Sequence, residues 1–129
     1  DGTHVSLSAL RGRDVVLYFY PMDNTPGCTK EACDFRDSWA RLQDAGVAVF
    51  GVSTQGSASH AAFAEKYHLP FPLLPDDKRE LAGKYHVPLT LGLVHRVTYL
   101  IGKDGNIKRV WEKVTPTGHA AEILAAVRE

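Results

Sequence analysis

The sequence predicts an α/β domain in which a central mixed β-sheet is flanked by helices. Two observations favour this class: apolar, β-branched runs alternate with helical stretches in the first half of the chain, and an Asp-Gly pair separates two β-rich runs further on. Strand and helix alternation is typical of parallel pairing, whereas Asp-Gly between strands indicates a hairpin, so the sheet must contain both directions. The length of 129 residues is that of one domain, and we expect residues 1–129 to form a single unit.

The first half of the chain supplies two strand and helix pairs. Asp14–Tyr20 is a nearly continuous apolar and aromatic run ended by a proline, which is typical of a strand buried on both faces. After a loop rich in turn residues, Cys28–Ala45 is a helical stretch stopped by a glycine. The same order then repeats, with Val47–Val52 as a second buried strand and Ser57–Tyr67 as a helix.

The second half is expected to complete the sheet. Phe71–Leu74 is at most a short strand because it contains a proline, and Asp76–Tyr85 is a short helix with two aspartates in its first turn. Arg96–Ile101 and Ile107–Val110 are the two strands of the hairpin. Gly118–Glu129 ends the chain as an amphipathic helix.

The composition excludes several classes of protein. Fifteen lysines and arginines balance 15 aspartates and glutamates, and the sequence pI is about 7.2, which argues against attachment to nucleic acid or membranes by bulk charge. Neither an apolar run of 18 residues nor a secretory pattern occurs, so we expect a cytoplasmic protein with no membrane span. Two cysteines are too few for a disulfide-stapled scaffold. The chemistry of these two thiols is therefore the central question.

The two cysteines lie on one predicted helix but face in different directions. On a helical wheel Cys28 falls in the apolar stripe that contains Ala32 and Phe35, whereas Cys33 lies about 140° away from Cys28. Five residues rise about 7.5 Å along a helix, and the offset adds to that separation, while a disulfide needs Cα atoms roughly 4.4 to 6.8 Å apart. The helix must unwind before these thiols can bond. A pair of unrelated buried cysteines and a switchable pair both remain open.

The position of Cys28 favours reactivity. The first turn of a helix offers unpaired N–H groups and the positive end of the helix dipole, and both stabilise a thiolate. Thr25 can place a hydroxyl near the same helix start, although for Thr25 alone an ordinary helix cap is the favoured role. Pro21 and Pro26 stiffen the intervening loop and remove backbone donors.

These residues resemble a known family. Pro21–Cys28 matches the peroxiredoxin active-site pattern Pro-x-x-x-Thr-x-x-Cys, and Tyr18–Asp37 closely resembles the bacterioferritin comigratory protein and peroxiredoxin Q subfamily. The resemblance covers nearly the whole chain and implies a thioredoxin-like fold and a thiol-dependent peroxidase with an antioxidant role. It continues through Gly51-Val52-Ser53, Phe63–Tyr67, Leu69–Leu74, Arg96–Ile101 and Gly118-His119-Ala120.

The resemblance also implies a role for each site residue. Cys28 would be the peroxidatic cysteine, whose thiolate attacks the O–O bond of a hydroperoxide and becomes a sulfenic acid. Cys33 stands at the resolving position and would capture that sulfur in an intramolecular disulfide. Thr25 would donate or relay a hydrogen bond to the thiolate and the peroxide oxygens, and Pro21 would shield the pocket. Arg96 would fix the thiolate and polarise the substrate, since it carries a permanent charge and several donors; without the resemblance, Arg96 is a surface charge at a strand edge.

Further expectations concern partners and the limits of the match. The resemblance implies hydrogen peroxide and organic hydroperoxides as substrates, and thioredoxin or a similar dithiol protein as reductant. We expect no cofactor, no metal, and neither nucleic acid nor membrane as partner, and an intramolecular resolving thiol favours a monomer. Three departures occur: Tyr85–Gly92 differs from the family pattern, Gly102 stands where an aspartate is common, and a further segment that contributes to an N-terminal hairpin is expected before Asp1.

Two other functions stay open beside the peroxidase. A general disulfide oxidoreductase has its two thiols separated by two residues, and the four residues that intervene here argue against it. A redox-sensing interaction module would use the same unwinding of the helix. The histidines at 4, 60, 68, 86, 95 and 119 lack metal-ligand spacing, strand alternation places His95 on the face opposite Arg96, and Ser53 lacks the Gly-x-Ser-x-Gly surroundings of a hydrolase.

Overall fold

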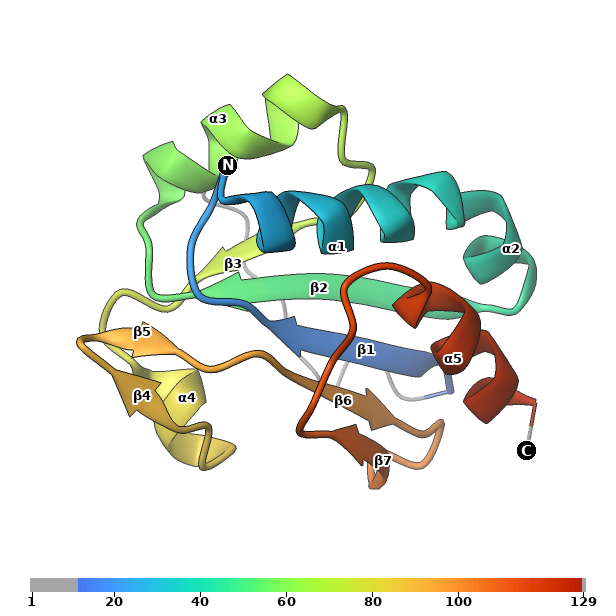
Figure 1. Ribbon diagram of the computed structural model, residues 1–129. Helices are drawn as coiled ribbons and strands as arrows, with labels where there is room; N and C mark the ends of the chain where they lie inside the picture. The colour runs from blue at the N-terminus through green and yellow to red at the C-terminus, as the bar shows by residue number, and fades with distance from the viewer. Residues whose placement is uncertain (1–11, 129) are drawn as a thin grey trace.

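The computed structural model describes residues 12–128, which form a central five-stranded sheet with helices on both faces (Figure 1). The predicted α/β class with a mixed sheet is confirmed. The segment expected before Asp1 lies outside the described residues. No helix in the described part of the chain is long and apolar enough to cross a membrane.

The sheet has the strand order β3-β2-β1-β6-β7. Its parallel half consists of β1 (Asp14–Phe19), β2 (Val47–Ser53) and β3 (Leu73–Pro75). Its antiparallel half is the predicted hairpin of β6 (Val97–Ile101) and β7 (Ile107–Trp111), which joins β1 through β6. Strand β1 therefore lies at the centre, with a parallel neighbour on one side and an antiparallel neighbour on the other.

The helices are divided between the two faces of the sheet. One face is covered by α1, α2, α3 and α5, and the other by the short helix α4 (Figure 1). Their bounds are Pro26–Asp37 for α1, Trp39–Asp44 for α2, Ser57–Tyr67 for α3, Glu80–Lys84 for α4 and His119–Val127 for α5.

Strand β1 separates the core into two parts. Successive side chains of a strand point to opposite faces. Val16 and Tyr18 pack among the residues of α1, α3 and α5, while Leu17 and Phe19 pack toward α4. All six residues of β1 are buried because both faces are covered, as its continuous apolar run predicted.

The predicted helix over Cys28–Ala45 is wrong as a single helix. It begins earlier, at Pro26, and it breaks at Ser38, where the backbone (φ −98°, ψ 8°) leaves helical geometry between α1 and α2. The Ser38 hydroxyl accepts a hydrogen bond from the Arg41 side chain at 3.2 Å. The break lies beyond both cysteines, so their relative placement on α1 is unaffected.

The helix predicted over Asp76–Tyr85 is also wrong in extent, because only Glu80–Lys84 is helical. Arg79 adopts a left-handed conformation (φ 60°), so the chain turns just before the helix. Asp76 lies outside the helix and accepts hydrogen bonds from the N–H groups of Leu81 at 3.0 Å and Ala82 at 2.9 Å. Asp76, which was predicted to lie in the first turn of the helix, thus lies before the helix and accepts hydrogen bonds from N–H groups of its first turn.

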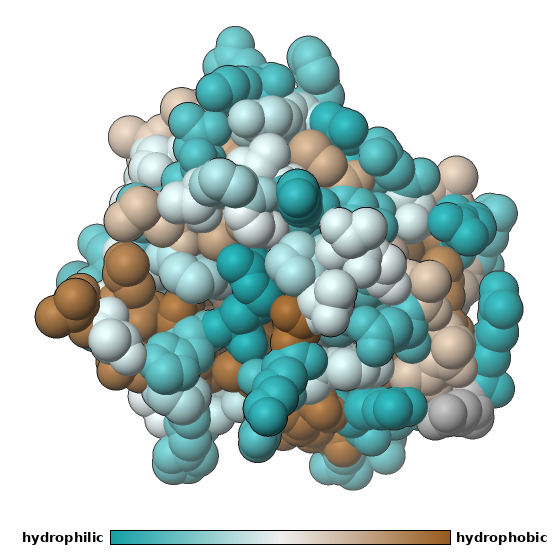
Figure 2. All heavy atoms as spheres, in the orientation of Figure 1, coloured by the Kyte–Doolittle hydropathy of each residue, from teal (hydrophilic) through white to brown (hydrophobic). Residues whose placement is uncertain are grey.

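A second, two-stranded hairpin was not predicted. Strands β4 (Leu89–Thr90) and β5 (Leu93–Val94) pair across Leu91 and Gly92, both of which have positive φ as this kind of tight turn requires. Strand β4 and the turn lie in Tyr85–Gly92, the segment that the sequence comparison with the resembled family set apart. The tip of the hairpin leaves Leu91 98% exposed, and Figure 2 shows an apolar area at the edge of the molecule where this hairpin lies.

Candidate active site

The loop after β1 delivers Cys28 to the first turn of α1, as predicted. Thr25 is the last residue before the helix and has extended backbone (φ −91°, ψ 155°), and Pro26 occupies the first helical position, where its fixed φ suits the helix. The N–H of Thr29 donates to the Thr25 carbonyl at 2.8 Å and closes the first turn. Cys28 is 1% exposed and lies where helix N–H groups and the dipole favour an anion.

Arg96 reaches this cysteine from the neighbouring strand. Antiparallel pairing sets Phe19 opposite Val97, so Arg96, just before β6, lies beside the loop that leaves β1. Its Nη2 donates to the Cys28 Sγ at 3.3 Å. The side chain is 20% exposed, so the alternative of a surface charge at a strand edge is wrong.

Glu31 is a site residue that the sequence reasoning missed. Its side chain is 0% exposed, and its Oε1 accepts a bond from the Arg96 Nη1 at 2.6 Å. Burial raises the pKa of Glu31 to about 7, although Arg96 acts in the opposite direction. Burial alone would lower the pKa of Arg96, but Glu31 and the Cys28 sulfur hold it above its ordinary value. The available signal was helical spacing, since residues three apart share a helix face.

Tyr18 belongs to the same buried core cluster as Cys28. Its hydroxyl is buried with no hydrogen-bond partner among the described residues, and its ring stacks on Phe35 at 4.7 Å between centroids. Burial, followed by the charges of Tyr20, Glu31 and Cys28, raises the pKa of Tyr18, so this phenol stays protonated. A Cβ at Gly51 would lie 2.9 Å from the Tyr18 ring, so glycine is what lets β2 pass this side chain.

Thr25 and Pro21 lie on the loop that precedes Cys28. The backbone of Thr25 occupies the N-cap position, but its side chain makes no capping bond, and its hydroxyl donates to the Met22 carbonyl at 2.9 Å. The expectation of an ordinary capping hydroxyl is therefore wrong. Pro21 is half-buried immediately after Tyr20.

Cys33 is half-buried further along α1, and both thiols are free. The predicted placement of both cysteines on one continuous helix is confirmed, and by helix geometry α1 must unwind before they can bond. The helix is anchored just beyond Cys33, where the Asp34 carboxylate accepts a bond from the Ala120 N–H at 2.8 Å. Arg36 donates to the Tyr67 carbonyl at 2.8 Å.

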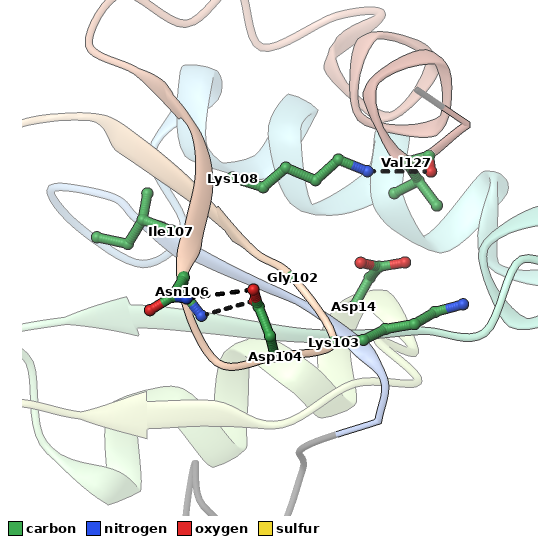
Figure 3. A pocket seen from close by; sticks show the side chains of 8 residues that line it. All are labelled: Asp14, Gly102, Lys103, Asp104, Asn106, Ile107, Lys108 and Val127. Atoms are coloured by element: carbon green, nitrogen blue, oxygen red, sulfur yellow. Dashed lines mark hydrogen bonds between the residues drawn. The ribbon is translucent and has the colours of Figure 1, made fainter.

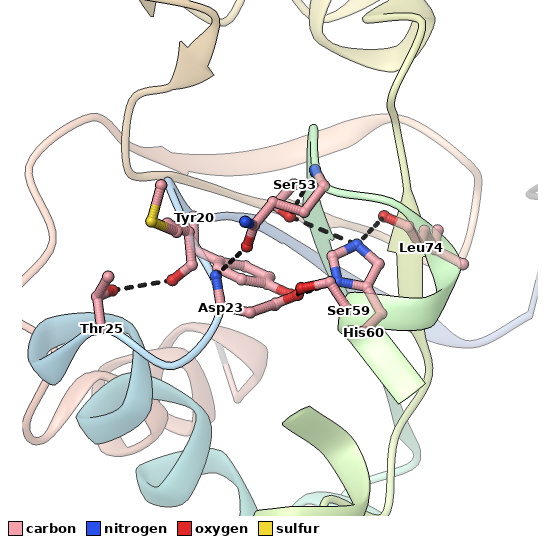
Figure 4. A network of polar contacts seen from close by, with 9 residues as sticks. Tyr20, Asp23, Thr25, Ser53, Ser59, His60 and Leu74 are labelled. Carbon is pink, nitrogen blue, oxygen red and sulfur yellow. Dashed lines mark hydrogen bonds and ion pairs between the residues drawn. The ribbon is translucent and has the colours of Figure 1, made fainter. Parts of the chain in front are cut away.

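His60, which the sequence pattern did not single out, lies beside the loop before Cys28. Its ring is 3% exposed and bonds to Asp23, which belongs to the loop before Cys28 (Figure 4). His95 is exposed and meets Thr90 at 2.7 Å, whereas Arg96 turns toward Cys28, so the two point apart as predicted. Among residues 12–128, no group of three potential ligands could hold a metal ion.

A cavity of about 540 Å³ lies away from the cysteines. It is formed at the turn between β6 and β7, beside Asp14 at the start of β1, whereas the cysteine site follows the other end of that strand (Figure 3). Charged side chains such as Lys103 and Lys108 line it, and Lys108 reaches the Val127 carbonyl of α5 at 3.2 Å. This cavity takes no part in the site around Cys28.

The fold and the site together define the class of protein to which this chain belongs. A buried cysteine in the first turn of a helix, held by an arginine that pairs with a buried glutamate, is the arrangement of a thiol-based redox enzyme. The model of the AhpC/TSA family matches residues 1–110, and the chain belongs to that family.

Two relatives of this chain are both named as peroxiredoxins. The chain is 44% identical to a putative peroxiredoxin bcp of Coxiella burnetii over 131 residues, covering 96% of this chain and 87% of the relative. It is 45% identical to the chloroplastic peroxiredoxin Q of Triticum aestivum, covering 99% of this chain but only 60% of the wheat protein.

Solved structures that superpose on this chain also come from a bacterioferritin comigratory protein and a peroxidoxin. A bacterioferritin comigratory protein of Xanthomonas campestris superposes with a TM-score of 0.92 at 35% identity, over 98% of this chain and 85% of that one. The BcpB peroxidoxin of Mycobacterium tuberculosis gives 0.87 at 38% identity, over 95% and 83%. The fold is thioredoxin-like, and the chain is a thiol-dependent peroxidase of the peroxiredoxin class.

Proposed function

We propose that the protein reduces hydroperoxides with Cys28 as the peroxidatic cysteine and Cys33 as the resolving cysteine, and that thioredoxin or a similar dithiol protein restores both thiols. The observation that carries the proposal is the 3.3 Å contact between the Arg96 guanidinium and the Cys28 sulfur in the first turn of α1. A guanidinium at this distance has further N–H donors that can reach the oxygens of a peroxide bound at the Cys28 sulfur.

In the first step the Cys28 thiolate attacks one oxygen of the peroxide in line with the O–O bond. A sulfur–oxygen bond forms, the O–O bond breaks, and the leaving oxygen takes up a proton to give water or an alcohol. Cys28 becomes a sulfenic acid. Arg96 donors lie where negative charge develops on the leaving oxygen, the Thr25 hydroxyl lies on the preceding loop, and Pro21 limits access of water.

In the second step the Cys33 thiol attacks the sulfenic sulfur. A sulfur–sulfur bond forms, the sulfenic oxygen leaves as water, and the product is an intramolecular disulfide. The intact helix separates the thiols, so α1 must unwind around Cys28 first. A dithiol protein then reduces the disulfide by exchange and becomes oxidised itself.

Substrate and setting follow from the same reasoning. We propose hydrogen peroxide and organic hydroperoxides as substrates, since the Xanthomonas campestris relative is described by its alkyl peroxide reduction activity. A resolving cysteine within the same chain removes the need for a second subunit, which supports a monomer. The bacterial relative supports a cytoplasmic setting, although the wheat relative is chloroplastic.

A thioredoxin-coupled peroxidase assay tests the proposal. The wild type should turn over hydrogen peroxide, and Cys28→Ser should show none of this activity. Cys33→Ser should react once with peroxide, fail to turn over with thioredoxin, and overoxidise more readily because its sulfenic acid is stranded. Undiminished turnover in Cys33→Ser would show that Cys33 does not resolve, and residual fast oxidation in Cys28→Ser would show that Cys28 is not the attacking thiol.

A further inference from the structure

A buried polar cluster joins the loop before Cys28 to helix α3. Its centre is the Asp23 carboxylate, whose side chain is only 4% exposed (Figure 4). Three donors surround this carboxylate: the Tyr20 hydroxyl at 2.5 Å, the Ser59 hydroxyl at 2.6 Å and the His60 Nδ1 at 2.8 Å. The Asp23 N–H also donates to the Gln55 side chain. Both the side chain and the backbone of Asp23 are thereby fixed.

The cluster holds Asp23 ionised. Burial on its own would raise the pKa of Asp23, but the hydrogen bonds from His60, Ser59 and Tyr20 outweigh burial and lower it below its ordinary value. A carboxylate only accepts hydrogen bonds, so the His60 Nδ1 carries a proton. On the other side of the ring, the His60 Nε2 lies 3.4 Å from the Ser53 hydroxyl, which can donate to it, and 3.2 Å from the Leu74 carbonyl. The ring is therefore held on both sides.

The cluster is not itself a catalytic site. Ser53, His60 and Asp23 lie in the order of a hydrolase triad, with the Ser53 hydroxyl 3.4 Å from the His60 Nε2. However, Ser53 is 0% exposed and His60 is 3% exposed, so no substrate reaches either side chain. The cluster can therefore act on the chemistry only through the loop that it holds.

The loop that contains Asp23 links the buried cluster to Cys28. Asp23 follows Met22, whose carbonyl accepts the Thr25 hydroxyl at 2.9 Å. A threonine hydroxyl has one hydrogen and two lone pairs, and here the hydrogen is committed to Met22. In this arrangement Thr25 accepts from a ligand, in contrast to the donating role that the resemblance implies, and the O–H of a hydroperoxide is the matching donor. Fixing Asp23 fixes the Met22 carbonyl, and the Met22 carbonyl sets the direction of the Thr25 lone pairs.

We propose that Asp23 and His60 are positioning residues for peroxide reduction, which tie the turn from Met22 to Thr25 to helix α3 and so aim the Thr25 hydroxyl at the peroxide. This inference rests on the proposed function of Cys28. Neither Asp23 nor His60 touches the reacting atoms. Misplacing a group by about 1 Å can cost about 100-fold in rate, so loosening this turn should slow attack on the peroxide more than any reaction that does not use Thr25.

The test compares two reactions of the same thiol in a Cys33→Ser background, where only Cys28 reacts. Asp23→Asn should slow oxidation by hydrogen peroxide about 10- to 100-fold while alkylation by iodoacetamide, which needs the thiolate but not Thr25, changes less than about twofold. His60→Asn, whose amide can replace the Nδ1 donor, should recover part of the peroxide rate relative to His60→Leu. Ser59→Ala removes one donor with little risk to the fold, and Ser57→Ala, exposed on the same helix, is its matched control.

A double-mutant cycle with Thr25→Val decides whether the cluster acts through Thr25. The expected result is that Asp23→Asn or Ser59→Ala adds little further loss once Thr25 is changed. Additive losses, equal losses in oxidation and alkylation, or wild-type oxidation rates in Asp23→Asn and Ser59→Ala would each overturn the proposal. Failure of the proposed function has a different signature, because the wild-type thiol itself would then react with peroxide no faster than a free thiol.

Discussion

Replacing Gly27 by alanine tests how tightly Arg96 is held against Cys28. Gly27 is the second residue of α1, and a Cβ there would lie 3.1 Å from the Arg96 Nη2, so the guanidinium would have to retreat by a few tenths of an ångström. It cannot retreat freely. Its Nη1 is bound to Glu31 at 2.6 Å and its Nη2 to the Cys28 sulfur at 3.3 Å.

The substitution should therefore lower activity, and the displacement of the held guanidinium should offset the stability that alanine adds to the helix. Alanine in an unobstructed helix stabilises by about 0.5 to 1 kcal/mol relative to glycine, which corresponds to a Tm about 2 to 4 °C higher, and Gly27→Ala should fall short of this gain because of the 3.1 Å contact. Since a misplacement of about 1 Å costs about 100-fold, a few tenths of an ångström should slow Cys28 oxidation about three- to tenfold. Stopped-flow oxidation by hydrogen peroxide and thermal unfolding measure the two effects.

Gly83→Ala is the matched control. Gly83 lies in helix α4, and a Cβ there would meet nothing within 4 Å. This variant should gain stability without losing rate. If Gly27→Ala oxidises at the wild-type rate, the guanidinium is not held in the way described, and the reasoning from the 3.1 Å contact fails.

Three further predictions concern substitutions of Arg96, Glu31 and Asp76. Arg96→Lys should slow Cys28 oxidation about 10- to 100-fold, because an ammonium group does not bind the sulfur and Glu31 as a fork; stopped-flow oxidation at the wild-type rate would contradict this. Burial raises the pKa of Glu31 from 4.5 to about 7, so the folded protein keeps a proton that the unfolded chain has released between these pH values. The wild type should lose up to about 3 kcal/mol of stability as pH rises through that window, and urea unfolding at about pH 5 and pH 8 should show that Glu31→Gln lacks this loss; an equal pH dependence in both would refute it. Asp76→Ala should cost about 1 to 2 kcal/mol in urea unfolding, because two helix N–H groups lose their acceptor, and it should leave the rate of peroxide oxidation unchanged; a stability equal to wild type would show that the two bonds contribute nothing.

The parts of the fold that the sequence predicted are those with strong local signals. The apolar run of β1 and the Asp-Gly hairpin of β6 and β7 are confirmed because burial on both faces and a tight turn each impose a distinctive pattern. The break at Ser38 and the short extent of α4 were missed. Both depend on side chains that bond to backbone or side-chain groups elsewhere in the local structure, and propensity along the chain does not contain that information.

The candidate site likewise contains residues that the sequence predicted and residues that it did not. The helical wheel predicted that Cys28 faces the core and that Cys33 cannot reach it, since both statements need only helix geometry. Arg96 was identified by resemblance alone, because its distance to Cys28 depends on the antiparallel register of β6 against β1. Glu31 and His60 were missed because a charged residue and a histidine are ordinarily exposed, and only their tertiary partners make burial tolerable.

The most direct test of the central claim is the intact mass of the protein after one equivalent of hydrogen peroxide, measured on the wild type, Cys28→Ser and Cys33→Ser. The wild type should lose two hydrogen atoms and stay monomeric, Cys33→Ser should gain one oxygen, and Cys28→Ser should remain unchanged. A covalent dimer in the wild type, or a loss of two hydrogens that persists in either variant, would contradict an intramolecular disulfide between Cys28 and Cys33.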